Sequence, residues 1–131
     1  MPDPKFRFVC APSALSGTPA GWAQEMLQEG ELALLGQEGI DAINTVAHDL
    51  GQTTIAVVRN EIDPADQDET VIASAGTIPL IWVAEAFSYR AHSWARERGA
   101  MTLLTECQGP LDDAERRRID RFVAILGRQS E

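Results

Sequence analysis

The start of the chain alternates between apolar and polar positions and then changes to helical spacing. Lys5–Cys10 alternates with period two and is rich in aromatic and β-branched residues, which predicts a strand. Thr18 followed by Pro19 is typical of a helix start, because threonine caps free amides and proline at the first position needs no amide hydrogen. We therefore expect a helix from Thr18 that breaks near Gly30, since glycine weakens a helix.

The middle of the chain carries the longest apolar stripe. After Glu31, one helical face is formed by Leu32, Leu35, Ile40, Ile43, Val46, Ala47 and Leu50. This stripe predicts a helix that ends at Gly51, a suitable left-handed residue. Thr53–Arg59 and Val71–Ala75 are then predicted to be two strands, joined by the charged loop Asn60–Thr70.

The next segment repeats the pattern of a cap followed by a proline. Thr77 precedes Pro79, and a helical stripe follows, made of Leu80, Val83, Ala84, Phe87, Ala91 and Trp94. A second long helix is therefore expected, ending at Gly99.

A strand and a last helix complete the prediction. Ala100–Cys107 alternates enough for a strand, and Gln108–Pro110 predicts a turn. Asp112 and Glu115 have the spacing of a capping box. The helix after them buries Ile119, Phe122, Val123 and Leu126 and is expected to end at Gly127.

This order of elements, βαββαβ with an added C-terminal helix, predicts an α+β fold of the ferredoxin-like sandwich type in one domain, residues 1–131. In that fold one face of an antiparallel sheet packs on helices, and a homodimer is a natural way to cover the other face. The alternative is a three-layer α/β fold with a parallel sheet. There the junctions Ser16–Thr18 and Ser74–Thr77 would converge and favour a phosphate site.

Two parts of the chain resemble a sensor family. Met101–Thr105 followed by Gly109–Asp113 is similar to the last strand and helix of a GAF-type sensor domain, and Ile40–Val58 is similar to its first helix and strand. The resemblance covers about a third of the chain and implies a GAF/profilin-like sensor fold as a further alternative. It implies no ligand-binding residue, because a helix is expected over Pro79–Arg98, where that family has more strands and its pocket.

Composition and charge narrow the function classes. The 131 residues are 44% hydrophobic, with 20 acidic and 11 basic side chains and a formal net charge of −9. The charge is uneven, since residues 1–76 hold 12 acids and three bases. Such an acidic chain is not expected to bind nucleic acid in general, and the run Arg116–Arg118 with Arg121 is interpreted as a solvated helix face.

No lysine or arginine occurs between Arg7 and Arg59, which suits a cationic partner, a metal or solubility alone. Apolar runs such as Ile78–Ala84 are too short to cross a membrane, and Met1–Pro4 lacks the features of a signal peptide, so a cytoplasmic location is expected.

The residue types that carry chemistry are few. Cys10 and Cys107 lack zinc-ligand spacing and are expected to be buried apolar residues. His48 is expected in the last turn of a helix, where the dipole favours a cation. His92 lies one turn from Ser88 on the expected second long helix, a weak hydrolase signal, because a nucleophile in mid-helix lacks oxyanion donors.

Three further groups of residues are considered as sites. Ser16, Thr18, Ser74 and Thr77 offer capped helix starts, where free amides could bind an anion. Trp82 is expected to be exposed beside Tyr89 on one helix, which would mark a partner or ligand surface together with His92. Asp63, Asp66 and Asp68 lack the pattern of a calcium loop and are interpreted as a solvated loop, so no metal is expected there. No cofactor is expected either.

The sequence therefore predicts a non-enzymatic regulatory or interaction module that binds a protein partner or a small ligand, as a homodimer. One alternative is a small enzyme that uses Cys107, His92 or His48. Another is an acidic escort for a basic partner, whose binding would weaken with salt.

Overall fold

The strands form one parallel sheet in the computed structural model, which describes residues 4–52 and 55–129. Its strands are β1 (Phe6–Cys10), β2 (Gly30–Leu35), β3 (Ala56–Val58), β4 (Leu80–Ala84) and β5 (Thr102–Glu106). Their order across the sheet is β3-β2-β1-β4-β5, and each neighbouring pair is parallel. The chain therefore winds outward from β1 to one edge and then returns to add β4 and β5 on the other side.

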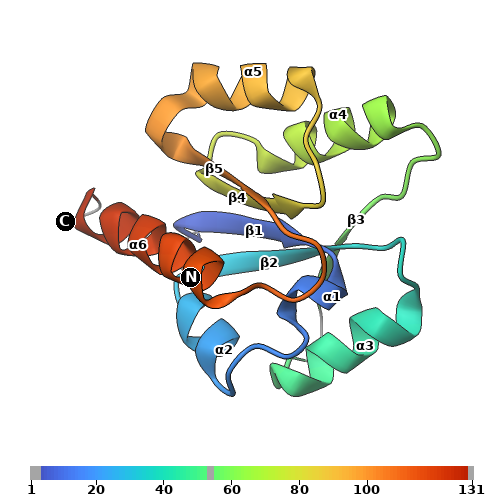
Figure 1. Ribbon diagram of the computed structural model, residues 1–131, viewed down its shortest axis with the longest axis vertical. Helices are drawn as coiled ribbons and strands as arrows, with labels where there is room; N and C mark the ends of the chain where they lie inside the picture. The colour runs from blue at the N-terminus through green and yellow to red at the C-terminus, as the bar shows by residue number, and fades with distance from the viewer. Residues whose placement is uncertain (1–3, 53–54, 130–131) are drawn as a thin grey trace.

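Helices cover both faces of this sheet (Figure 1). The helices are α1 (Pro12–Leu15), α2 (Trp22–Met26), α3 (Ile40–Asp49), α4 (Pro64–Ala75), α5 (Tyr89–Arg98) and α6 (Asp113–Gln129), with a short 3₁₀ turn η1 (Gly99–Met101). α4 and α5 lie on one face, and α1, α2, α3 and α6 lie on the other. This is the layering of a three-layer α/β architecture.

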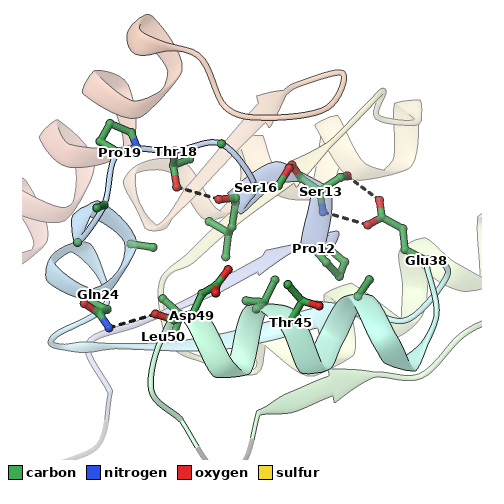
Figure 2. Close-up of a pocket in the computed structure, with 17 residues that line it drawn as sticks. Pro12, Ser13, Ser16, Thr18, Pro19, Gln24, Glu38, Thr45, Asp49 and Leu50 are labelled. Atoms are coloured by element: carbon green, nitrogen blue, oxygen red, sulfur yellow. Dashed lines mark hydrogen bonds between the residues drawn. The ribbon is translucent and has the colours of Figure 1, made fainter.

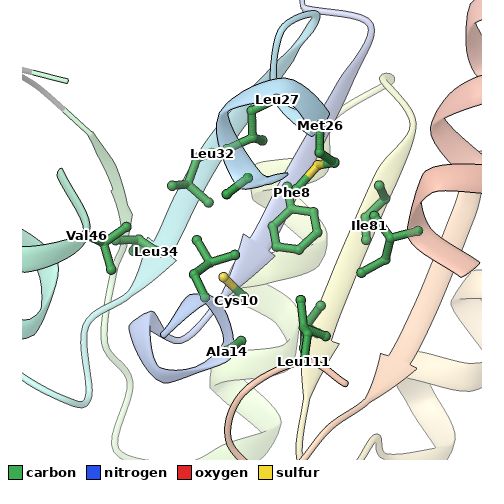
Figure 3. Close-up of a cluster of buried hydrophobic side chains, with 14 of the residues drawn as sticks. Phe8, Cys10, Ala14, Met26, Leu27, Leu32, Leu34, Val46, Ile81 and Leu111 are labelled. Carbon is green, nitrogen blue, oxygen red and sulfur yellow. The ribbon is translucent and has the colours of Figure 1, made fainter. Parts of the chain in front are cut away.

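Each face of the sheet has its own apolar core, because successive strand residues point to opposite sides. On β1, Phe8 and Cys10 belong to the larger core under α1, α2, α3 and α6. Figure 3 shows these side chains together with Leu34 and Leu111. Val9 points the other way, into a smaller core that α4 and α5 cover.

The mixed helix-and-strand class is confirmed, but the ferredoxin-like topology is wrong, since the pairings are parallel and both faces are covered. Two strands were mistaken for helices. Glu31–Leu35 belongs to β2 rather than to the start of a helix, and Leu80–Ala84 is β4 rather than the first part of one. A strand buried on both faces shows a continuous apolar run without alternation, and such a run also fits a helical stripe.

In the segment after β3 the error is the opposite one, because a helix forms where a loop and a strand were predicted. Val71–Ala75 is not a strand, and the expected loop Asn60–Thr70 is mostly helical, because α4 spans Pro64–Ala75. The Asp63 carboxylate accepts a hydrogen bond of 2.8 Å from the Ala65 amide and so caps this helix.

Several local predictions are confirmed. The first and last strands lie where expected, and Gly51 and Gly99 follow the ends of α3 and α5 with positive φ. The capping box is formed, since the Asp112 amide donates to Glu115 and the Glu115 amide donates to Asp112, each at 2.8 Å. α6 continues beyond the expected end at Gly127, to Gln129.

Some expectations concern residues outside the described ranges, namely Met1–Asp3 and Thr53–Thr54, where the second predicted strand was expected to begin. Within the described ranges, no helix combines the length and the apolar character needed to cross a bilayer.

Candidate functional site

The carboxyl ends of β1 and β4 meet where the strand order reverses, which is the usual ligand site of a parallel sheet. Connections leave β1 toward β2 on one side, whereas β4 begins the other half of the sheet. Ligands of such folds bind in the crevice outside this switch point.

In this chain the crevice is filled by the segment between β5 and α6 (Figure 1). The Leu111 amide donates a 3.0 Å hydrogen bond to the Ala14 carbonyl, and the Leu111 side chain is only 2% exposed. It belongs to the same apolar core as Cys10 (Figure 3). The chain itself therefore occupies the usual binding position.

Both cysteines lie at this end of the sheet, and both are buried, as the sequence predicts. The Cys107 thiol donates to the Gly109 carbonyl at 2.9 Å. Burial raises the pKa of Cys107 to about 11, with a smaller effect from the nearby carboxylates of Glu115 and Asp112. Burial also raises the pKa of Cys10, far above its ordinary value. Such thiols stay protonated at neutral pH and are poor nucleophiles.

The main cavity of the described structure lies beside this end of the sheet, on the flank of α3 (Figure 2). It has a volume of about 630 Å³, is open to solvent on one side, and is bordered by α1, the loop Ser16–Gly21, the first turn of α2 and one side of α3. Apolar side chains from Leu15, Val46 and Leu50 form part of its wall. Its size lies within the range of small-molecule sites in proteins.

The loop over this cavity depends on local backbone geometry. Gly17 and Gly21 both have positive φ, 72° and 84°, which glycine adopts without a steric penalty. The Glu38 carboxylate binds α1, which precedes this loop, accepting hydrogen bonds from the Ser13 amide at 3.0 Å and from the Ser13 hydroxyl at 2.6 Å. The expected helix start at Thr18 is wrong, since its hydroxyl donates to the Leu15 carbonyl and α2 begins only at Trp22.

Polar side chains from α2 and α3 complete the lining. The Asp49 carboxylate points from the end of α3 toward the loop that carries Ser16 and Thr18 (Figure 2). The Gln24 amide donates a long hydrogen bond of 3.4 Å to the Asp49 backbone carbonyl. The ionisable groups in the lining are thus Glu38 and Asp49, both acidic.

A smaller hollow lies at the carboxyl ends of β4 and β5, with a volume of about 290 Å³. Its lining includes four carboxylates, those of Glu85, Glu106, Asp112 and Glu115. Even so, no group of three or more metal-ligating side chains in the described part of the chain is close enough to hold an ion.

The structure separates the two junctions that the sequence singled out. Ser16 and Thr18 line the main cavity. Ser74 lies in the last turn of α4, where its hydroxyl donates to the Val71 carbonyl, and Thr77 lies between α4 and β4, at the amino end of the sheet. The two junctions therefore do not converge even in a parallel sheet, because Thr77 precedes a strand rather than a helix.

The expected aromatic surface is also corrected. Trp82 lies in β4 and is 3% exposed, packed edge-on against Phe87 and Trp94. Tyr89 is exposed, but it starts α5 and does not share an element with Trp82. His92 is exposed on α5, with its ring against Phe87.

No Ser–His pair is formed on α5. Ser88 is the N-cap rather than a mid-helix residue, and its hydroxyl donates to Asp68 at 2.5 Å and accepts from the Ala91 amide. His48 is exposed in the last turn of α3, as expected from the sequence.

Sequence reasoning missed the two carboxylates of the main cavity, Glu38 and Asp49. The available signal was the stretch without lysine or arginine between Arg7 and Arg59, which contains every residue of the lining.

No family model, curated protein or solved structure matches the chain, so the site is interpreted from its own geometry.

Proposed function

We propose that this protein is a non-enzymatic regulatory module that binds a small ligand in the cavity between the loop Ser16–Gly21 and α3. The observation that supports this proposal is a cavity of about 630 Å³ with an apolar wall and converging polar side chains. These are the usual features of a small-molecule site. The carboxylates of Glu38 and Asp49 are its ionisable groups, and the lining holds neither a nucleophilic thiol nor a histidine.

The residues named for the enzyme alternative lie in different parts of the fold. His48 is on α3 and His92 is on α5, and these two helices cover opposite faces of the sheet (Figure 1). Cys107 is buried at the carboxyl end of β5. These side chains do not form a common site, which disfavours an enzyme that combines them.

The proposal does not depend on a homodimer. The sequence argument for a dimer was a sheet face left open, and in the described structure helices cover both faces. The open sheet face that would have formed the dimer interface is therefore absent from the described structure.

A pocket-filling variant tests the proposal. Ala42 lies on α3 and lines the cavity, so Ala42→Phe should occupy the ligand's space. Asn44→Phe is the matched control, because Asn44 is exposed on the same helix and is not part of the lining. Binding of a mixture of small fragments, followed by ligand-observed NMR, should be lost in Ala42→Phe and retained in Asn44→Phe. Equal binding by both variants would place the ligand elsewhere and overturn the proposal.

A further inference from the structure

We infer that the ligand of the main cavity is a small organic cation, either a protonated amine or a guanidinium group carried on a short hydrocarbon. This inference rests on the proposed function and names the class of ligand for the same site.

The first observation concerns the direction of hydrogen bonds in the lining. The lining contains four side-chain hydroxyls, and each donates its single proton to an acceptor within the protein. Ser16 and Thr18 donate to the carbonyls of Ser13 and Leu15, both at 2.8 Å. Thr45 donates to the Asp41 carbonyl at 2.9 Å, and Ser13 donates to Glu38.

A hydroxyl group has one hydrogen to donate and two lone pairs that accept. These four groups therefore present only acceptors to a ligand. A protonated amine carries three donors and a guanidinium carries five, and neither has an acceptor. The lining thus complements a ligand rich in donors.

The second observation is charge. Glu38 and Asp49 bring two carboxylates to the cavity, and the whole lining lies in the stretch without lysine or arginine. The donors of Ser13, at which an anion could bind, already hold the Glu38 carboxylate. A phosphate or carboxylate ligand would meet negative charge without a compensating base.

The Asp49 carboxylate is the group placed to receive the cation. It points into the cavity (Figure 2), and the Gln24 hydrogen bond goes to the Asp49 backbone rather than to this carboxylate. Asp49 also lies in the last turn of α3, where the helix dipole disfavours a negative side chain. Its charge is therefore not explained by the stability of the helix.

The apolar wall of the cavity favours a ligand that carries a hydrocarbon portion beside its charge. Leu15, Val46 and Leu50 line the cavity together with the prolines Pro12 and Pro19. A hydrocarbon portion attached to the cation would bury apolar area against them, which a bare inorganic ion cannot do.

Three probes of similar shape and different charge distinguish a site for a cation from a site for a neutral or an anionic ligand. They are cyclohexylamine, cyclohexanol and cyclohexanecarboxylate, titrated into the full chain at neutral pH and physiological salt, with calorimetry and protein-observed NMR as readouts. The variants are Asp49→Asn and, as matched control, Asp41→Asn, which removes the same charge from α3 outside the lining. Asp49→Asn should fold normally, since it removes an unfavourable charge from the helix end.

The inference predicts saturable binding of the amine, with the alcohol and the carboxylate much weaker. Hydrogen bonds to a charged group justify an affinity loss of about tenfold in Asp49→Asn. Asp41→Asn should stay close to the unmodified protein, and higher salt should weaken the binding.

Other outcomes overturn the inference in distinguishable ways. Equal losses in the two variants would mean that the amine binds the acidic surface diffusely. Tighter binding of the alcohol or the carboxylate in the cavity would overturn the cation while leaving the proposed ligand site intact. Failure of all three probes to perturb the cavity would count against both proposals.

Discussion

Trp82 is the residue whose structural role differs most from the sequence expectation, and its role can be tested directly. Its ring centroid lies 5.2 Å from that of Phe87 and 6.5 Å from that of Trp94, in the core under α4 and α5. Trp82→Ala should therefore lower the free energy of unfolding by about 3 to 5 kcal/mol, the usual loss for a buried aromatic.

Tyr89→Ala is the control for this prediction, because Tyr89 is 81% exposed. It should change stability by less than about 0.5 kcal/mol in the same urea denaturation series. Similar losses in the two variants would contradict the buried position of Trp82.

The buried thiols predict how stability depends on pH. The pKa of Cys107 is raised by burial from 9.0 to about 11. Between these values the folded chain keeps a proton that the unfolded chain has lost, so the thiol's contribution is present below pH 9 and disappears as the pH rises to about 11.

The measurement is the free energy of unfolding across this pH range for the unmodified chain and Cys107→Ala. The decline with rising pH should be shallower in the variant. An identical decline in both proteins would show that folding does not raise the pKa of the Cys107 thiol.

At the residue scale, the sequence identified only part of the candidate site. Ser16 and Thr18 were singled out because a capped helix start could bind an anion, and they do line the cavity, although from a loop, since α2 begins only at Trp22. Glu38 and Asp49 were not found, because an acidic residue in a loop or at a helix end looks like an ordinary solvated group until the fold places it beside a cavity.

At the element scale, Gln67 on α4 joins three segments. Its side-chain oxygen accepts from the Glu61 amide at 3.0 Å and from the Gln37 side chain at 3.1 Å, and its amide group donates to the Arg59 carbonyl at 3.1 Å. Gln67→Leu should lower stability by about 1 to 3 kcal/mol, because it removes hydrogen bonds from partly buried backbone groups.

Ala73→Leu serves as the control for Gln67, since Ala73 is exposed on the same helix. Thermal unfolding of the two variants compares them directly. Equal melting temperatures would mean that the Gln67 hydrogen bonds do not hold these segments together.

The elements also show what single-sequence patterns can predict. Elements with a solvent-exposed side, such as the edge strand β5 and the amphipathic helix α6, were placed correctly. β2 and β4 were not, because their burial on both faces removes the alternation that identifies a strand.

α4 was missed for a different reason. Asp63 followed by Pro64 is the same cap-and-proline signal that was used at Thr18, and here it does start a helix. The β-branched residues near Val71 favoured a strand, but tertiary packing outweighs such propensities.

At the scale of the whole molecule, the segment between β5 and α6 covers the carboxyl end of the central strand β1. Leu111 is buried over the carboxyl end of β1 and belongs to the core that includes Cys10 and Ile119. Leu111→Ala should lower the free energy of unfolding by about 2 to 5 kcal/mol and speed the reaction of Cys10 with a thiol reagent.

The matched control is Gln108→Ala, at an exposed position of the same segment. It should leave both the stability and the labelling rate of Cys10 unchanged. If Leu111→Ala also left them unchanged, the segment would not be sealing the crevice at the switch point.

The central claim is that a ligand binds between the loop Ser16–Gly21 and α3. The most direct test is an amide chemical-shift map recorded while the full chain is titrated with the amine, alcohol and carboxylate probes. The account predicts saturable shifts concentrated at Gly17, Gly21 and Thr45. Shifts concentrated instead on α5 around Tyr89 and His92, or spread without a focus, would contradict it.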